Sequence, residues 1–388
     1  MARIACTSEY VFAAAGNLLY RLTTKTSQFE AVNVQELLDK LPRIAKQKTE
    51  QPNKDDGYVE AEISAKFQYL CLATSSCESF LAIGTSHKTV LIIHPDDFSS
   101  VRAFRIPKAP TCITFDNDSR FVIVGDRAGH VCRYSIAAPA TVEGHKDITG
   151  EICHFEGEPL MGAISMVLDV AITPDNRHLI VSDRDEKVRI HRYPNAYVIY
   201  AFGLGHAHYV SSICVFQDRI FSAGGDSTIK EWSVEGKELL SITISEDRPI
   251  KKIRVFENKV VVLMEQSTVL LVIDLETREV RSIESDAELL DICEMHGEVF
   301  AVSRKGLVSF TYLTCAVSKT MPADFVEQLK NVKEPIEHYF KNVTHNNMED
   351  YHKRKQEKMN KGKEKKQKQR KRKNKSLSEE DVKKTPAC

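Results

Sequence analysis

The sequence shows few signs of a metal centre or of a fold held by disulfides. Its ten cysteines are scattered singly through 388 residues, with no CxxC pair and no Cys/His cluster at zinc-finger spacing. Several stand in runs of alternating apolar residues, where a thiol packs as a small hydrophobic side chain. These are Cys71, Cys112, Cys132 and Cys214. We therefore expect free cysteines, no metal and a reducing compartment.

Signatures of catalysis are also missing. No glycine-rich nucleotide loop follows a strand, and neither GxSxG nor HExxH occurs. No acidic-Gly-x-Gly-x-Gly stretch is present to hold S-adenosylmethionine. The nearest imitation is GLGHAH at residues 203–208, whose two histidines lack a further ligand at metal-site spacing. We predict no catalytic, cofactor-binding or metal-binding residues, with His206 opening a repeat and His208 exposed.

Long apolar runs are absent as well. No window approaches about eighteen uninterrupted apolar residues, and MARIACTSEYVFAAAG at the start has no long apolar run behind a basic stretch. We expect an intracellular, soluble protein without membrane contact.

One repeated unit accounts for most of the chain: an apolar strand, a short turn, a second alternating strand, a polar gap and another strand. Six copies begin at Phe80, Phe121, Leu179, Ile220, Val261 and Val299. Their turns, near Gly84, Gly125, Asp183, Gly225, Met264 and Ser303, are separated by 41, 58, 42, 39 and 39 residues. Most of these intervals are close to the WD-repeat period of about 40 to 45 residues. A single unit cannot bury its own faces, so the copies must stack into a ring.

The segment EYVFAAAGNLLYRL near the N-terminus supplies a seventh unit, most simply a blade closed by pairing the two ends of the chain. We predict an all-β fold, a seven-bladed WD40 β-propeller over residues 1–320, with inserted loops at 24–61 and 137–160. A short helical extension follows at 321–350, and a basic disordered tail at 351–388.

The least degenerate copy contains the only tryptophan of the chain. It joins four residues at the spacing of the hydrogen-bond network of WD-repeat blades, in which a turn Asp orients a His and a Trp binds a hydroxyl. The four, predicted to be structural, are His206, Ser222, Asp226 and Trp232. His191 stands at the place of the tryptophan in the preceding copy.

The formal net charge of zero is a cancellation between two regions. Residues 351–375 hold fourteen Lys or Arg and two Glu, a net +12, and the other residues hold forty basic and fifty-two acidic side chains, a net −12. Six basic residues near the end of this tail are predicted to serve nuclear import or to contact an RNA backbone. These are Lys368, Arg370, Lys371, Arg372, Lys373 and Lys375. We favour import, and hence a nuclear location.

From Ser165 the sequence reads SMVLDVAITPDNRHLIVSDRDEKVRI, which closely resembles the WD-repeat non-catalytic subunit of the tRNA (guanine-N7)-methyltransferase. The likeness is clear to about Trp232 and weak in the last two blades. It implies a non-catalytic scaffold that binds and stabilises the catalytic subunit in a heterodimer, and that meets tRNA through the complex. It also implies that the charged turn at residues 183–189 is part of the docking surface.

The residues of this turn divide between fold and docking. Aligned on the next copy, Asp185 takes the place of Asp226, so we predict that it caps the turn. The predicted partner contacts are Asp183, Arg184, Glu186, Lys187 and Arg189. Among these, Glu186 is expected to accept a Lys or Arg of the enzyme, and Arg189 to take a carboxylate.

Two alternatives share the fold. One is a generic nuclear WD-repeat scaffold for ribosome biogenesis or ubiquitin-ligase assembly, in which the charged turn is merely solvated. The other, less favoured, is a propeller hydrolase.

Overall fold

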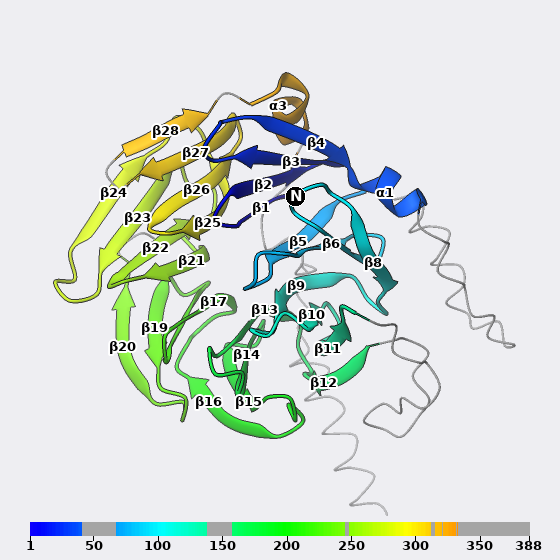
Figure 1. Ribbon diagram of the computed structural model, residues 1–388. Helices are drawn as coiled ribbons and strands as arrows, with labels where there is room; N and C mark the ends of the chain where they lie inside the picture. The colour runs from blue at the N-terminus through cyan, green and yellow to red at the C-terminus, as the bar shows by residue number, and fades with distance from the viewer. Residues whose placement is uncertain are drawn as a thin grey trace, which may run out of the picture. The chain divides into compact units, whose positions relative to one another are not determined.

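The computed structural model describes residues 1–40, 67–137, 157–244, 248–311, 315–319, 321–330 and 332. Within these ranges the chain forms seven four-stranded antiparallel sheets and two helices (Figure 1). The prediction of an all-β, seven-bladed propeller is therefore confirmed. No helix of the described residues is long and apolar enough to cross a membrane.

Each sheet is one blade, built from four strands that are consecutive in the sequence. The blades are β1 (Ala2–Cys6), β2 (Tyr10–Ala15), β3 (Leu18–Thr23) and β4 (Phe29–Asn33); β5 (Tyr69–Thr74), β6 (Leu81–Thr85), β7 (Thr89–Ile93) and β8 (Ser100–Arg105); β9 (Pro110–Phe115), β10 (Phe121–Asp126), β11 (His130–Ser135) and β12 (Glu158–Gly162); β13 (Val167–Ile172), β14 (His178–Asp183), β15 (Lys187–Arg192) and β16 (Ile199–Leu204); β17 (Val210–Phe216), β18 (Arg219–Gly224), β19 (Thr228–Trp232) and β20 (Glu238–Thr243); β21 (Ile250–Phe256), β22 (Lys259–Met264), β23 (Val269–Asp274) and β24 (Val280–Glu284); β25 (Leu289–Met295), β26 (Glu298–Ser303), β27 (Gly306–Thr311) and β28 (Cys315–Lys319).

The blades are held together by apolar side chains between their faces. The first strand of each blade contacts the first strand of the next, from β1 through β25 and back to β1. Second strands such as β14 are buried on both faces, because one face packs on each neighbouring blade. Between the first two blades, for example, Phe12 and Leu19 pack against Tyr69 and Leu91. The alternating runs of the sequence thus fill seven inter-blade layers rather than one central core.

Polar side chains on the innermost strands bind backbone groups of the next blade. The Asp169 carboxylate accepts the Ile213 N–H at 2.8 Å, and the Asp291 carboxylate accepts the Ile4 N–H at 3.1 Å. Burial raises the pKa of Asp291, but the charges of Lys252 and Arg3 and a hydrogen bond from Lys252 together outweigh burial and hold this pKa below its ordinary value. These carboxylates satisfy N–H groups that a blade cannot satisfy by itself.

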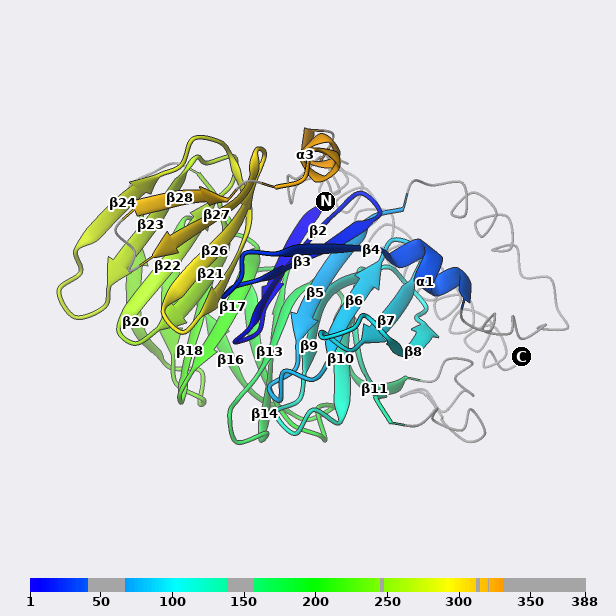
Figure 2. The ribbon, with the colours of Figure 1, turned by 45° about the horizontal axis from the view of Figure 1, so that its top comes forward.

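Closure of the ring differs from our prediction. The first blade consists entirely of β1–β4 and the last entirely of β25–β28, so no blade is shared between the two ends of the chain. The two blades are instead joined by α3 (Ala323–Lys330), which lies beside both in Figures 1 and 2. Phe325 and Leu329 of α3 are buried in one apolar cluster with side chains of both blades, and the Tyr20 hydroxyl donates to Asp324 at 2.5 Å.

The predicted insertions begin and end elsewhere than expected. Residues 29–33, assigned to the first inserted loop, form β4, because their backbone pairs with β3 and completes the first blade. Helix α1 (Val34–Lys40) follows directly. Residues 158–160, assigned to the second loop, belong to β12 for the same reason. Residues 41–66, 138–156 and the basic tail lie outside the described residues, and so does the predicted helical segment IEHYFKNV.

Candidate functional site

The charged turn predicted from the sequence connects β14 to β15, and one carboxylate organises it. Asp183 ends β14 with a side chain that has no exposed surface. One of its oxygens accepts the backbone N–H groups of Asp185 at 2.9 Å and Lys187 at 3.2 Å. The other accepts Nε and Nη2 of Arg189 at 3.0 and 2.9 Å. The turn is therefore held from inside by a charge-assisted network that is fully paired.

This geometry corrects three of the predicted roles. Asp183 cannot offer its buried carboxylate to a partner. Arg189, only 15% exposed, already binds a carboxylate of its own turn, that of Asp183. Asp185, predicted to cap the turn, points a 47% exposed carboxylate toward Arg184 at 3.7 Å.

The misassignment of Asp185 has a physical reason. Asp226, its aligned counterpart, faces inward because its carboxylate binds the His206 imidazole. Val167 and Val210 occupy the same position of the first strand in the two blades. His206 lies four residues before Val210, and the residue four before Val167 is Ala163. Asp185 therefore has no imidazole to orient.

Besides Asp185, three charged side chains of the turn remain on the surface. Arg184 and Glu186 are exposed, and Lys187 is half-buried with its ammonium donating to the Asp185 carbonyl at 2.9 Å. Glu186 has a left-handed backbone with φ of 70°, as does Lys88, with φ of 55°, at the same position of the turn between β6 and β7. This conformation, uncommon for a residue with a side chain, is thus set by the turn and not by the side chain. The turn presents both signs of charge on a rigid support.

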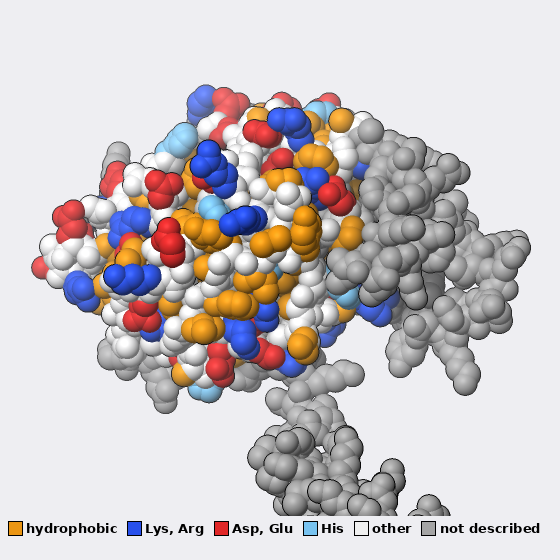
Figure 3. Space-filling model, turned by 90° about the horizontal axis from the view of Figure 1, so that it is seen from below, with side chains coloured by type: hydrophobic (Ala, Val, Ile, Leu, Met, Phe, Trp, Pro, Cys, Tyr) orange, Lys and Arg blue, Asp and Glu red, His pale blue; other side chains and the backbone are white. Residues whose placement is uncertain are grey.

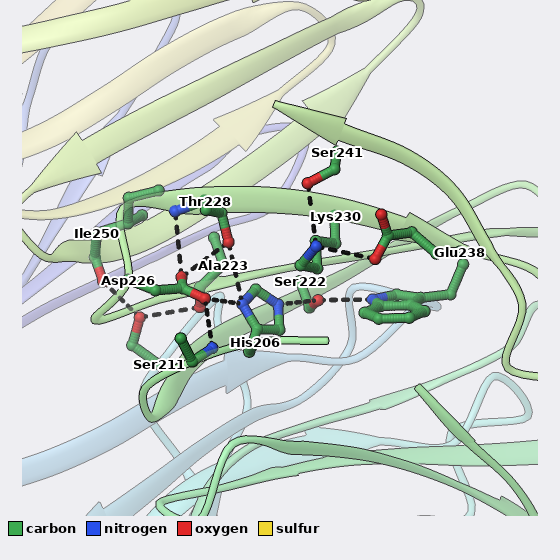
Figure 4. A network of polar contacts seen from close by, with 12 residues as sticks. His206, Ser211, Ser222, Ala223, Asp226, Thr228, Lys230, Glu238, Ser241 and Ile250 are labelled. Atoms are coloured by element: carbon green, nitrogen blue, oxygen red, sulfur yellow. Dashed lines mark hydrogen bonds and ion pairs between the residues drawn. The ribbon is translucent and has the colours of Figure 1, made fainter. Parts of the chain in front are cut away.

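The structure brings together the four residues of the predicted WD-repeat network (Figure 4). The Trp232 indole donates to the Ser222 hydroxyl at 2.7 Å, and this hydroxyl contacts His206 Nε2 at 2.7 Å. His206 Nδ1 lies 2.9 Å from Asp226. Burial raises the pKa of Asp226, but hydrogen bonding and the charge of His206 outweigh it and hold this pKa well below its ordinary value. The network joins the strands of one blade to the segment that enters it.

His191 occupies the place of this tryptophan in the preceding blade and forms a different contact. Its Nδ1–H donates to the Ala196 carbonyl at 2.6 Å, whereas its buried Nε2 has no hydrogen-bond partner. Burial, with a smaller contribution from the Arg189 charge, lowers the pKa of His191 to about 4. The imidazole is therefore neutral and structural at physiological pH.

The remaining predicted sites divide between the described part of the chain and the rest. His208 is exposed, next to the buried His206. Among the described residues, no three His, Cys, Asp or Glu side chains are grouped as a metal ion would require. The six basic residues from Lys368 to Lys375 lie outside the described residues.

Comparison with known proteins places this geometry in a family. Residues 138–320, which include the turn, match the model of the tRNA methyltransferase TRM82 WD40 domain. A Caenorhabditis elegans protein named tRNA (guanine-N(7)-)-methyltransferase non-catalytic subunit is 33% identical over 387 residues, covering 92% of this chain and 93% of its own length. The chain belongs to this family of non-catalytic subunits.

Other members of the family match a shorter region. The subunit TRM82 of Eremothecium gossypii is 32% identical over 45% of this chain and 39% of its own, and wdr4 of Danio rerio is 32% identical over 45% and 40%. Family membership makes this chain a non-catalytic subunit, in agreement with the missing catalytic motifs.

Among solved structures, the computationally designed Ika8 protein has a TM-score of 0.53 and 14% identity, covering 80% of this chain and 83% of its own. That likeness concerns the fold alone.

The neutral His191 predicts a specific acid sensitivity of the fold. Because its pKa is about 4 in the native protein and 6.5 ordinarily, protonation favours the unfolded chain. The stabilisation is complete above about pH 6.5 and decreases as the pH falls toward 4, by about 2 kcal/mol between pH 7 and pH 5. Urea unfolding of the wild type and of His191→Phe at both pH values tests this. The variant should lose less stability than the wild type, and equal losses would contradict the assignment.

Proposed function

We propose that this chain binds a catalytic tRNA (guanine-N7)-methyltransferase subunit and stabilises it for N7-methylguanosine formation in tRNA. The observation that carries the proposal is a relative of that name, which is similar over nearly its whole length and not merely within a common blade motif. A generic scaffold for another nuclear assembly would share the fold but would not require this likeness.

In this proposal the turn between β14 and β15 is the charged part of the docking site. Glu186 accepts a Lys or Arg of the catalytic subunit, and Arg184 and Lys187 face carboxylates. Asp183 and Arg189 do not touch the partner but fix the backbone from which these side chains project. A surface that keeps its conformation loses little entropy on binding, and this favours the ordering of loops on the enzyme.

The basic tail carries two further proposals. Its net charge of +12 over residues 351–375 suits a nuclear-import signal, and the same charge suits contact with tRNA phosphates in the complex. Both agree with a heterodimer in the nucleus that modifies tRNA.

Affinity purification and depletion test the function as a whole. A tagged chain should co-purify a methyltransferase, and depletion of the chain should remove N7-methylguanosine from tRNA hydrolysates while other methylated nucleosides persist. A stable complex of other composition, with normal N7-methylguanosine after depletion, would defeat the proposal in favour of a generic scaffold.

Charge reversal tests the turn. Glu186→Lys should weaken binding of the catalytic subunit by about tenfold at low salt and less at high salt, because like charges then face each other. The fold should tolerate the change, since Lys88 occupies the same left-handed position of another blade. Lys88→Glu is the matched control and should bind as the wild type does. Equal affinities of both variants and the wild type, measured by titration calorimetry, would count against this site.

Deletion of residues 353–375 tests the tail. If the tail contacts phosphates, the logarithmic salt dependence of tRNA binding by the complex should flatten by roughly 0.7 to 0.9 per lost contact. An unchanged slope, together with loss of the fluorescently tagged chain from the nucleus, would leave import alone. An unchanged slope and an unchanged location would refute both roles.

A further inference from the structure

Exposed apolar side chains are concentrated on one of the seven blades. The large apolar residues that are exposed in and around the β13–β16 blade are Ile164, Tyr197, Val198, Ile199, Tyr200, Phe202 and Leu204. The rest of the described chain exposes only Leu239, Val280 and Val317, one on each of three other blades. In Figure 3, which views the molecule from below Figure 1, apolar side chains gather on the side where this blade lies. An apolar patch of this kind marks an interaction surface more often than chance.

The outer strand β16 carries most of the patch and differs in composition from its counterparts. Its sequence, IYAFGL, has no charged residue. The other six outer strands, β4, β8, β12, β20, β24 and β28, each contain at least one. Charged side chains on an edge strand discourage association with other chains. β16 alone lacks this protection.

Strand register shows that the fold does not require these apolar residues. Phe202 pairs with Arg189, and Leu204 pairs with Lys187. At the same positions of the following blade, Ser241 pairs with Lys230 and Thr243 with Thr228. The β21–β24 blade has Ser282 and Glu284 there. Since two other blades form with polar residues at these positions, blade packing does not explain why Phe202 and Leu204 are apolar.

The patch is continuous with the charged turn. Leu204 lies opposite Lys187, and the Arg189 guanidinium stands 5.5 Å from the centre of the Phe202 ring. On the other side, the Arg184 N–H donates to the Met166 carbonyl at 3.0 Å, which places the segment after Ile164 beside the turn. Charge and apolar surface thus meet at one edge of one blade.

We propose that the β16 surface, defined as Ile164, Ile199, Phe202 and Leu204, packs against an apolar face of the catalytic subunit. The proposal rests on the proposed function and extends its docking site beyond the turn. The charged turn orients the partner and accelerates encounter, whereas burial of the β16 surface supplies most of the affinity. The face that fits is apolar, bordered by basic and acidic side chains that match Glu186 and Arg184.

The test gives β16 the residues of its neighbour. The double variant Phe202→Ser/Leu204→Thr has the side chains of Ser241 and Thr243 at the same register, so the blade should fold with an unchanged melting temperature. We expect its dissociation constant for the purified catalytic subunit to rise about tenfold, and the loss to persist at about 0.5 M salt, where exposed charges are screened. The matched control is Leu239→Ser, which removes an exposed apolar side chain from the outer strand β20 of another blade. This variant should bind normally.

Other outcomes distinguish a failure of the β16 surface from a failure of the proposed function. Normal binding by the double variant, with weakened binding by Glu186→Lys, would overturn the β16 surface and leave the proposed function standing. Absence of binding by the wild type would defeat the function itself. Sedimentation of the chain alone addresses a second copy as the occupant: a wild-type dimer that the double variant converts to monomer, with unchanged affinity for the catalytic subunit, would also overturn the proposal.

Leu204→Thr alone separates packing from any disturbance of Arg189, because it keeps the Phe202 ring beside that guanidinium. A loss of affinity of about half the logarithmic effect of the double variant supports packing. A single variant that binds normally would place the effect on Arg189 and overturn the apolar role of β16.

Discussion

Four-stranded blades can bury their faces only against one another, so each blade of this molecule depends on the ring being closed. If one inter-blade layer opened, two apolar sheet faces would meet water, at a cost of about 25 cal/mol per Å² exposed. Closure joins the first and last blades, which share no strand. It rests on the cluster formed by both blades with Phe325 and Leu329 of α3, and on the contact between the Ile4 N–H and Asp291. The helix beyond the last blade is therefore part of the propeller rather than an extension of it.

On this ring, the turn between β14 and β15 keeps one carboxylate inside and leaves other charges at the surface. Asp183 is fully buried and would destabilise the blade if it were unpaired, since a buried charge without partners costs several kcal/mol. Arg189 and two backbone N–H groups provide the pairing. Because these groups satisfy one another, Arg184 and Glu186 have no structural role that would keep them from a partner. The apolar residues of β16 lie beside the pair of Asp183 and Arg189. The Phe202 ring contacts the Arg189 guanidinium, whereas two other blades have polar residues at the positions of Phe202 and Leu204.

The sequence predicted the parts of this arrangement that follow from periodicity. Alternating apolar residues and the recurring turn spacing indicated seven blades, and the spacing from His206 to Trp232 indicated the network that Figure 4 shows. The sequence prediction turned Asp185 inward, but the inward carboxylate is that of Asp183. In the next blade the aspartate aligned with Asp185 binds His206, and Ala163 stands at the place of that histidine here. The closure by α3 depends on side-chain packing between segments that are far apart in the sequence. The limits of the inserted loops depend on the pairing of β4 with β3 and of β12 with β11, which the apolar alternation did not indicate. The apolar character of β16 is unusual only in comparison with the outer strands of other blades, and that comparison requires the strand register.

The position of α3 has a consequence for how the molecule is made. Domains of a growing chain tend to fold in the order in which they leave the ribosome. Here the β1–β4 blade is synthesised first, yet one of its faces is covered by β25–β28 and α3, which are synthesised last among the described elements. The first blade therefore cannot bury that face until the last blade and α3 have been made. The ring can therefore close only after nearly all of the described chain has been synthesised.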